Sequence, residues 1–248
     1  MQGYVRVVRL RIAIALVVAA AALAGCGRTT AELAPKAQLP AVPEVETSAT
    51  APSSPRPRTA APAQKQRAPA DPRLVQRALA SLGYLPAAAV TGIWDARTSH
   101  AVLAFQGWEG LARDGIVGPQ TLSALEKARR PMPTADLGAR HVEVHRDKGA
   151  TLLVERGRVV RALHSSSGAG ADATPAGRYS IFRKEINSWS VPHRVWLPYA
   201  SYFNAGIAFH GYPDVPSYPA SHGCVRLPVA EAPFAYAFMA VGTPVAVY

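Results

Sequence analysis

Cysteine is scarce in this chain: among 248 residues only Cys26 and Cys224 occur, too few for a disulfide framework. Acidic residues are also few, with 16 against 27 lysines and arginines, which gives a formal net charge of +11. This excess predicts attraction to anionic surfaces such as nucleic acid, lipid headgroups or acidic cell-wall polymers. No block of Lys and Arg with interleaved aromatic residues occurs, so nucleic acid is not an expected partner.

A long apolar run is also missing. The most apolar stretch, Ile12–Ala24, has about 13 residues, fewer than the roughly 20 that span a bilayer as a stable helix. Arg6, Arg9 and Arg11 precede this stretch and small residues follow it. That order is typical of a secretory signal.

The end of this stretch, Leu23-Ala24-Gly25-Cys26, resembles a bacterial lipoprotein signal. The resemblance implies cleavage before Cys26, which would then carry the lipid of an extracytoplasmic, membrane-anchored lipoprotein at the cell envelope. Residues 1–26 are therefore interpreted as the signal and its lipidation site. An ordinary secretory signal cleaved near Ala24 is the alternative. If the lipoprotein interpretation holds, Cys224 is the one free thiol of the mature protein.

Residues 27–70 are rich in Ala, Pro, Ser and Thr, and they lack aromatic residues and apolar periodicity. Such a segment cannot bury enough surface to offset its chain entropy. We expect a disordered linker of polyproline character.

Residues 71–130 show a helical pattern. Asp71-Pro72 is typical of a helix start, and Gly83 follows apolar residues spaced by three and four positions as a helix stop. A second helix is predicted from about 95 through 105 and a third over 119–128. The prediction is a small all-α bundle of three helices.

Several motifs in this segment resemble the repeat of peptidoglycan-binding domains. The resemblance implies that residues 71–130 hold the glycan and stem peptides of peptidoglycan. The alternative is a domain that only packs against its neighbour, because no single residue stands out as a ligand contact. In chain order, the motifs are Val75-Gln76-Arg77-Ala78-Leu79, Leu82-Gly83-Tyr84, Thr91-Gly92-Ile93-Trp94-Asp95, Ala104-Phe105-Gln106 and Asp114–Thr121.

From His141 the pattern changes to alternating apolar and polar residues with many β-branched side chains, which over 141–163 is typical of antiparallel strands. Pro228–Met239 is predicted to form a helix. Residues 138–248 are therefore expected to be mostly β, with one or two helices. Strands are predicted at 141–145, 151–155, 158–163, 174–181, 206–209 and 242–248.

The stretch Ser221–Arg226 places Cys224 between small and imidazole-bearing residues, with His210 upstream. A cysteine attacks as its thiolate, and a nearby imidazole can take the proton and stabilise the charge. One residue separates His222 from Cys224, so their side chains share a face on an extended backbone. The pattern favours a nucleophile over a core residue.

These residues resemble the catalytic domain of L,D-transpeptidases of the YkuD type, whose signature is a histidine followed after a loop by Ser/Thr-His-Gly-Cys. The resemblance implies a β-sandwich-like fold and a cell-wall acyltransferase that forms 3→3 peptidoglycan cross-links without a cofactor. It covers residues 138–248 and rests on Thr174-Pro175-Ala176-Gly177, Ile207-Ala208-Phe209-His210-Gly211, Ser221–Arg226 and Val241–Val245.

The resemblance also implies catalytic roles. Cys224 would attack the carbonyl of the third stem-peptide residue and form a thioester, with His210 as general base and later as acid. The carbonyl of Gly211 or of a neighbour would fix the tautomer of His210. The backbone N–H groups of Gly223 and Cys224 would form an oxyanion hole.

The remaining motif residues are assigned to substrate binding. Ser221 and His222 would shape the donor pocket or polarise the oxyanion. Arg226, which stands where many members of the family have asparagine, suits a substrate carboxylate, and a solvated surface charge is the alternative.

Two other functions are compatible with the motif. His210, His222 and Cys224 are legitimate zinc ligands and His193 could join them, but the set lacks the paired short spacings of structural zinc sites, so no metal is expected. The second alternative is a non-catalytic peptidoglycan-binding lipoprotein.

Two neighbouring segments have less specific patterns. Ser165–Gly168 is typical of a loop. The aromatic residues between 189 and 203 are expected either to line the substrate cleft or to pack in the core. They are Trp189, Trp196, Tyr199, Tyr202 and Phe203.

Overall fold

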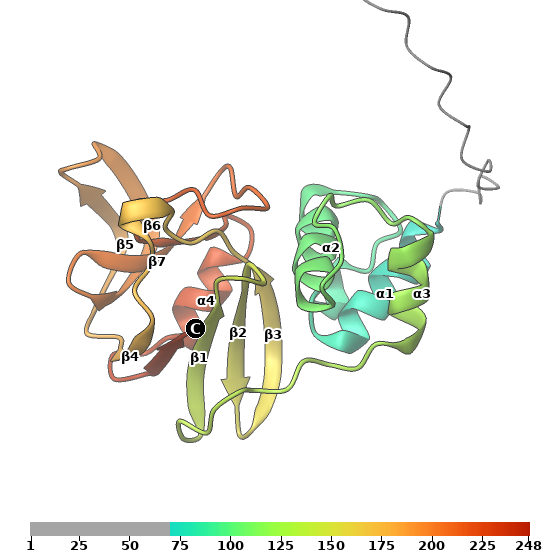
Figure 1. Ribbon diagram of the computed structural model, residues 1–248, viewed down its shortest axis with the longest axis horizontal. Coiled ribbons are helices and arrows are strands. Elements are labelled where there is room, and N and C mark those ends of the chain that lie inside the picture. The colour runs from blue at the N-terminus through green and yellow to red at the C-terminus, as the bar shows by residue number, and fades with distance from the viewer. Residues whose placement is uncertain (1–69) are drawn as a thin grey trace, which may run out of the picture. The chain divides into compact units, whose positions relative to one another are not determined.

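The computed structural model describes residues 70–248, which form a helical region and a β-rich region (Figure 1). The predicted export signal, the lipidation site Cys26 and all of the predicted linker except Ala70 lie outside the described residues. No helix within residues 70–248 is sufficiently long and apolar to traverse a lipid bilayer.

The helical region begins and ends its helices where the sequence places caps. Asp71 caps the first helix by accepting a hydrogen bond from the Arg73 N–H (2.9 Å), and Gly83 ends it with φ of +88°, a conformation that favours glycine. Asp95 caps the second helix through the Thr98 N–H (2.7 Å). The predicted three-helix bundle is confirmed. Its elements are α1 (Pro72–Leu82), the 3-10 turn η1 (Ala87–Ala89), α2 (Ala96–Trp108) and α3 (Pro119–Lys127).

Two buried glutamines organise the loops of this bundle in the same way. Gln76 on α1 accepts a hydrogen bond from the Gly92 N–H (2.7 Å), and Gln106 on α2 accepts one from the Gly115 N–H (2.9 Å). Each glutamine amide nitrogen also donates to the carbonyl of the residue after that glycine. Both glycines have positive φ, so the two halves of the bundle repeat one construction.

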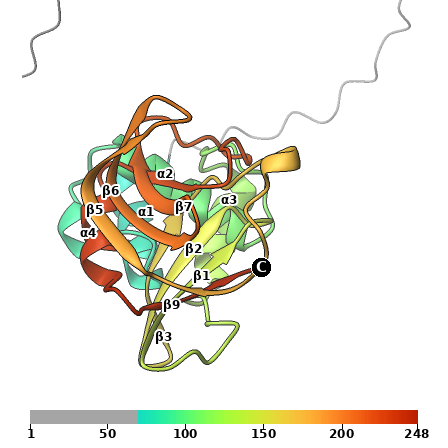
Figure 2. The same cartoon turned by 90° about the vertical axis from the view of Figure 1, so that its left-hand side faces the viewer.

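The β-rich region contains two sheets. The five-stranded sheet has the order β3-β2-β1-β9-β4, and the four-stranded sheet has the order β5-β6-β7-β8, with β5, β6 and β7 side by side (Figure 2). The strands are β1 (Arg140–His145), β2 (Ala150–Glu155), β3 (Arg158–His164), β4 (Gly177–Ser180), β5 (Arg183–Ser190), β6 (Val195–Asn204), β7 (Ile207–Tyr212), β8 (Val225–Pro228) and β9 (Pro244–Val247), and two helices join them, η2 (Gly170–Asp172) and α4 (Ala232–Phe238).

Apolar side chains from both sheets form one core. Val142 and Leu153 come from the five-stranded sheet, Phe209 and Val225 come from the four-stranded sheet, and all four are almost completely buried. Phe238 of α4 joins the same cluster. The mostly β, sandwich-like architecture that the sequence predicts is therefore confirmed.

The antiparallel strands predicted over 141–163 are confirmed in β1, β2 and β3, whereas three other features of the strands and helices were missed or misplaced. β1 also pairs with β9, and β7 with β8, in parallel, because residue periodicity does not reveal the direction of a partner that is distant in sequence. The last helix begins at Ala232 because Pro228 still belongs to β8, where it lies opposite Tyr212. The hairpin of β5 and β6 was not predicted, because only Ser188 of β5 is buried and the strand lacks an apolar alternation.

The helical region and the five-stranded sheet share a second hydrophobic cluster. Leu152 of β2 and Val159 and Ala162 of β3 belong to the same cluster as Leu79 and Phe105 of the bundle. The Ala162 N–H also donates to the carbonyl of Gly83 (2.9 Å). The bundle core therefore extends onto this sheet.

Candidate active site

The backbone on both sides of the motif Ser221–Arg226 holds it in place. β8 pairs in parallel with β7, so that Arg226 lies opposite His210. On the other side, Ser166 exchanges two backbone hydrogen bonds with Arg226 (2.9 and 3.1 Å), and the Ala169 N–H donates to the carbonyl of Ser221 (3.1 Å). The serines at 165–167 are buried, and their segment packs against the motif on the side opposite β7.

A cavity of about 520 Å³ opens over this motif. Its walls come from the motif, from β7 and from the hairpin of β5 and β6. The lining residues that matter below are Trp189, His193, Tyr202, His210, Ser221, His222, Cys224 and Arg226.

His210 is buried, and its ring is oriented by the neighbouring backbone. Nδ1 lies 2.9 Å from the carbonyl oxygen of Gly211, which can only accept, so Nδ1 carries the proton and Nε2 keeps a free lone pair. Burial lowers the pKa of His210 to about 4, and the positive charge of Arg226 acts in the same direction. At neutral pH this imidazole is uncharged and able to accept a proton.

Cys224 is half-buried, and its Sγ lies 3.8 Å from the carbonyl oxygen of Gly206. Burial raises the pKa of the Cys224 thiol above its usual value, and a hydrogen bond with the backbone of Ala208 and the positive charge of Arg226 only partly oppose this. The resting residue is therefore a neutral thiol. Within the described residues no hydrogen bond joins Cys224 to His210, although both line the same cavity.

The turn before Cys224 is closed by Ser221. Its hydroxyl donates to the carbonyl of Cys224 and accepts a hydrogen bond from the Gly223 N–H (3.2 Å). Gly223 has φ of +107°, and a Cβ there would lie 3.3 Å from the Ile207 side chain. The Gly223 N–H is thus already engaged inside the motif, which leaves the Cys224 N–H as the better oxyanion donor of the two.

Gly211 allows β7 to approach α4 closely. A Cβ on Gly211 would lie 3.0 Å from the Cβ of Ala232 and 3.4 Å from the Pro198 ring. A larger residue would push β7 away and displace the carbonyl that orients His210.

Arg226 places a positive charge in the cavity. Its guanidinium carbon lies 4.2 Å from the centre of the Tyr212 ring, in a cation–π arrangement. In the described part of the chain no carboxylate forms a salt bridge with Arg226. An unpaired guanidinium beside a thiol is suited to a substrate carboxylate.

His222 connects the motif to the hairpin of β5 and β6. Its ring stacks on the ring of His193, with centroids 4.5 Å apart and planes 20° apart. His193 lies in the turn between the two strands, so the end of the hairpin contacts the motif. Of the five aromatic residues between 189 and 203, Trp189 and Tyr202 line the cavity, whereas Phe203 packs in the core.

Some residues that line the cavity were not predicted from the sequence. Arg183 and Gly206 line the cavity without having been singled out, and Arg183 lies over the Tyr202 ring at 3.9 Å. One signal was available: Trp189 and Trp196 flank a short segment and pair directly across the hairpin. Cross-strand aromatic pairs of this kind are typical of hairpins.

A metal site is the alternative function of His210, His222 and Cys224. Among residues 70–248, no three His, Cys, Asp or Glu side chains are grouped so that they could hold a metal ion. The His222 ring stacks on the ring of His193, and His210 uses Nδ1 for the Gly211 carbonyl.

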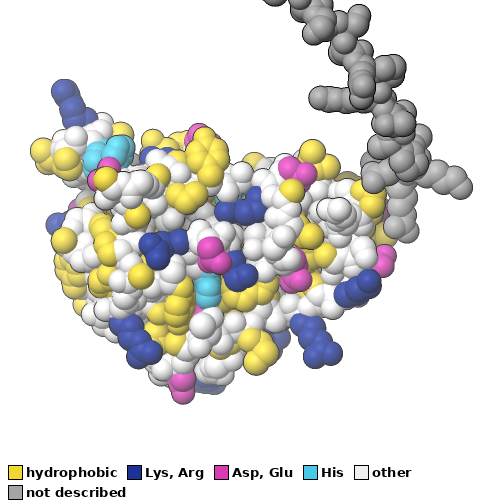
Figure 3. Space-filling view, in the orientation of Figure 1, with side chains coloured by type: hydrophobic (Ala, Val, Ile, Leu, Met, Phe, Trp, Pro, Cys, Tyr) yellow, Lys and Arg dark blue, Asp and Glu magenta, His cyan; other side chains and the backbone are white. Residues whose placement is uncertain are grey.

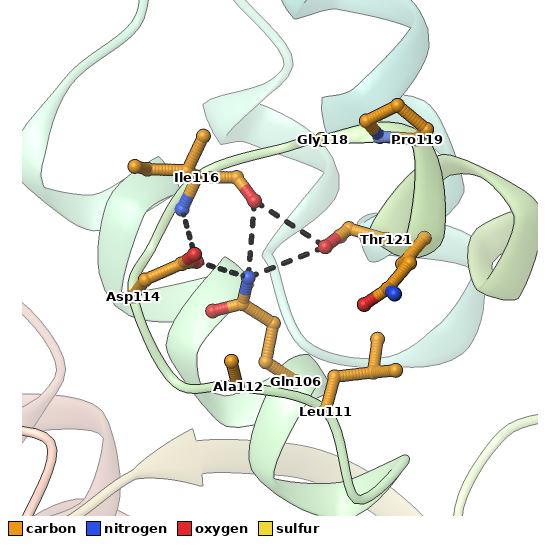
Figure 4. A pocket seen from close by; sticks show the side chains of 9 residues that line it. Gln106, Leu111, Ala112, Asp114, Ile116, Gly118, Pro119 and Thr121 are labelled. Atoms are coloured by element: carbon orange, nitrogen blue, oxygen red, sulfur yellow. Dashed lines mark hydrogen bonds between the residues drawn. The ribbon is translucent and has the colours of Figure 1, made fainter. Parts of the chain in front are cut away.

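A smaller cavity, of about 160 Å³, lies in the helical region beside Gln106. Figure 4 shows Gln106, Asp114, Ile116 and Thr121 pointing toward one another. The Gln106 amide nitrogen donates to Asp114 Oδ1 (2.7 Å), the Ile116 carbonyl (3.0 Å) and Thr121 Oγ1 (3.3 Å). These groups satisfy one another, so Gln106 holds a loop and is not a free ligand contact.

The basic side chains do not form one continuous patch on the face drawn in Figure 3. Lys and Arg lie there among hydrophobic and acidic side chains.

Comparisons with known proteins give a family match for the helical region and another for the β-rich region. Residues 139–247 match the model of the YkuD L,D-transpeptidase catalytic domain, and residues 69–125 match that of a peptidoglycan binding domain. A sequence comparison with curated proteins gave no significant match.

Solved structures provide further matches. The crystal structure of an L,D-transpeptidase from Xylanimonas cellulosilytica is 35% identical, with a TM-score of 0.68, and the match covers 77% of this chain and all of that one. An L,D-transpeptidase from Stackebrandtia nassauensis is 26% identical, with a TM-score of 0.48, and the match covers 73% of this chain and 91% of that one.

Proposed function

Because this chain belongs to the L,D-transpeptidase family and also carries a peptidoglycan-binding domain, we propose that it forms 3→3 peptidoglycan cross-links through a thioester on Cys224. The observation that carries the proposal is one cavity that holds a cysteine thiol, a neutral histidine with a free Nε2 and an unpaired guanidinium. We assign the peptidoglycan-binding domain to residues 71–130 and the catalytic domain to 138–248.

The first half-reaction begins with a neutral pair. The raised pKa of the Cys224 thiol and the lowered pKa of His210 both disfavour an ion pair before substrate binds. His210 Nε2 therefore acts as general base while Cys224 attacks the carbonyl carbon of the third stem residue. The contact between the two side chains tightens when substrate fills the cavity, as catalytic hydrogen bonds often do.

The tetrahedral intermediate places a negative charge on the former carbonyl oxygen. The Cys224 N–H stabilises this oxyanion, and the Gly223 N–H contributes less because it already donates to Ser221. When the intermediate collapses, the bond to the terminal D-alanine breaks and His210 returns its proton to that amine. An amine of a second stem then attacks the thioester and restores the thiol.

Arg226 and His222 bind the donor stem. The Arg226 guanidinium receives the carboxylate of the leaving D-alanine, and its position over Tyr212 fixes the orientation of the fork. His222 forms part of the donor pocket together with His193.

We further propose that the protein acts outside the cytoplasm as a lipoprotein at the cell envelope. Residues 1–26 would be the signal with lipid on Cys26, and residues 27–70 the linker. Mass spectrometry of the mature N-terminus tests this: a lipidated Cys26 supports it, and an unmodified N-terminus at another residue contradicts it.

The test of the enzymatic proposal uses a disaccharide-tetrapeptide fragment and mass spectrometry of its products. The wild-type protein is expected to release D-alanine and form a dimer linked between the two third residues. Cys224→Ala is expected to form no dimer while still pelleting with purified sacculi. Dimer formation by Cys224→Ala would overturn the proposal.

A further inference from the structure

Thr174 is completely buried behind the motif and does not line the cavity. Its hydroxyl accepts a hydrogen bond from the Gly168 N–H (2.9 Å) and donates to the carbonyl oxygen of Gly223 (2.7 Å). Its own carbonyl accepts a hydrogen bond from the Arg146 guanidinium (2.8 Å). The hydroxyl therefore has a fixed position and one strong bond to the residue before the nucleophile.

The backbone around Gly168 and Gly223 is packed too closely to accept any side chain. A Cβ on Gly168 would lie 2.7 Å from both the Cα and the N of Gly223, and 2.0 Å from the carbonyl oxygen of Asp172. Gly223 itself has a positive φ, a conformation that few side chains adopt. Thr174 is the side chain that ties these two glycine segments together.

The bond to Gly223 also determines where the next N–H points. The carbonyl of Gly223 and the N–H of Cys224 belong to one planar trans peptide group, so they point in opposite directions. The carbonyl points toward buried Thr174, whereas Cys224 lines the cavity. Holding the carbonyl thus directs the Cys224 N–H away from Thr174, on the side of the substrate.

We propose that Thr174 is the positioning residue of the oxyanion site, in that its hydroxyl fixes the Gly223–Cys224 peptide group. This assignment rests on the proposed function. In the step concerned, the Cys224 sulfur bonds to the substrate carbonyl carbon, and the π electrons move to the oxygen. The Cys224 N–H donates to that oxygen, and the pair returns when the carbon–nitrogen bond breaks and the amine leaves with the proton from His210.

Two reactions of Cys224 separate this role from a general structural one. Acylation by the tetrapeptide stem passes through an oxyanion. Alkylation by iodoacetamide forms a sulfur–carbon bond and releases iodide, and it needs no oxyanion donor. The variants are Thr174→Val, which keeps the shape and removes the hydroxyl, and Thr174→Ser, which keeps the hydroxyl. Thr151→Val is the matched control, because Thr151 is equally buried and its hydroxyl donates only to Ser165.

We expect Thr174→Val to lower kcat for acylation by about 100-fold with KM unchanged, the loss typical of a misplaced oxyanion donor. Alkylation should stay within about threefold of wild type, and Thr174→Ser and Thr151→Val should acylate within about threefold, because the oxyanion donor remains in place. Thr174→Ala serves, with the same expectation, if the valine variant does not fold.

The assignment would be overturned if Thr174→Val were acylated at the wild-type rate, or if its rates of acylation and alkylation fell by the same factor. Failure of the wild-type protein to form any acyl-enzyme would instead overturn the proposed function, and the assignment with it.

Discussion

The helical region and the catalytic cavity differ in whether their polar side chains are hydrogen-bonded within the protein. In the bundle, Gln76 and Gln106 are buried and form hydrogen bonds with the loops around them. In the cavity, the Arg226 guanidinium forms no salt bridge with any described residue, and the Cys224 Sγ lies a long 3.8 Å from the carbonyl oxygen of Gly206. Both regions contain cavities, so it is the unpaired polar groups that identify the chemical site.

Removing the base should give the largest effect. His210→Asn keeps a donor for the Gly211 carbonyl and removes Nε2, so acylation of Cys224 should fall by about 10³-fold, as expected for loss of a general base. Stopped-flow acylation by a carbapenem measures the rate. His100→Asn is the control, since His100 lies on α2 and does not line the cavity. Similar losses in both variants would contradict the assignment of His210.

Gln106 tests the other side of the comparison. Gln106→Leu leaves the partly buried Gly115 N–H without its acceptor and removes the amide donor that Asp114, Ile116 and Thr121 share, which should cost about 2 kcal/mol of unfolding free energy. The exposed Gln120 lines the same cavity, and Gln120→Leu should change stability by less than about 0.5 kcal/mol. Urea unfolding measures both.

Sacculus binding completes this test. A folded Gln106→Leu variant that keeps its stability but no longer pellets with sacculi would show that Gln106 contacts the polymer. That result would break the distinction between the two regions.

Arg226 should show a smaller, substrate-dependent effect. Arg226→Gln removes the charge, and KM for a tetrapeptide with a free terminal carboxylate should rise about tenfold, the size of one charge-assisted hydrogen bond. KM for the matching carboxamide should barely change. An equal rise with both substrates would mean that Arg226 supports the cavity wall and does not bind the carboxylate.

The smallest expected effect concerns pH: activity should fall only at a lower pH than it would with an ordinary histidine as the base. A general base must be unprotonated, and burial lowers the pKa of His210 to about 4, so acylation at pH 5 should retain roughly nine tenths of its neutral rate. An unperturbed histidine would retain only about 3% at that pH. A pH profile of kcat/KM that is half-maximal near 6.5 would contradict the neutral resting pair.

Local sequence signals were enough to predict the helical bundle and most of the strands. Asp71 and Asp95 act on the next few residues, and the structure shows both as helix caps. The parallel pairing of β1 with β9 joins opposite ends of the catalytic region, and no local pattern carries that information. The hairpin of β5 and β6 was not predicted for a different reason: only one residue of β5 is buried, so the strand has no apolar alternation.

In the candidate site, too, local motifs predicted some residues, whereas the roles of others depend on contacts between segments distant in sequence. Cys224 and His210 stand out because their chemistry is rare and the motif is local, and the structure brings both to one cavity. Thr174 belongs to the motif Thr174–Gly177, but the motif does not reveal the role of its side chain, because that role depends on two hydrogen bonds, one from the Gly168 N–H and one to the Gly223 carbonyl. The stacking of His193 on His222 likewise depends on a hairpin that sequence patterns did not predict.

The most direct test of the central claim is the mass of the protein after rapid mixing with a tetrapeptide stem and quenching in acid. The account predicts an adduct equal to the stem without its terminal D-alanine, located on the peptide that contains Cys224 and absent from Cys224→Ala. No adduct in the wild-type protein, or an adduct at Ser165–Ser167, would contradict it.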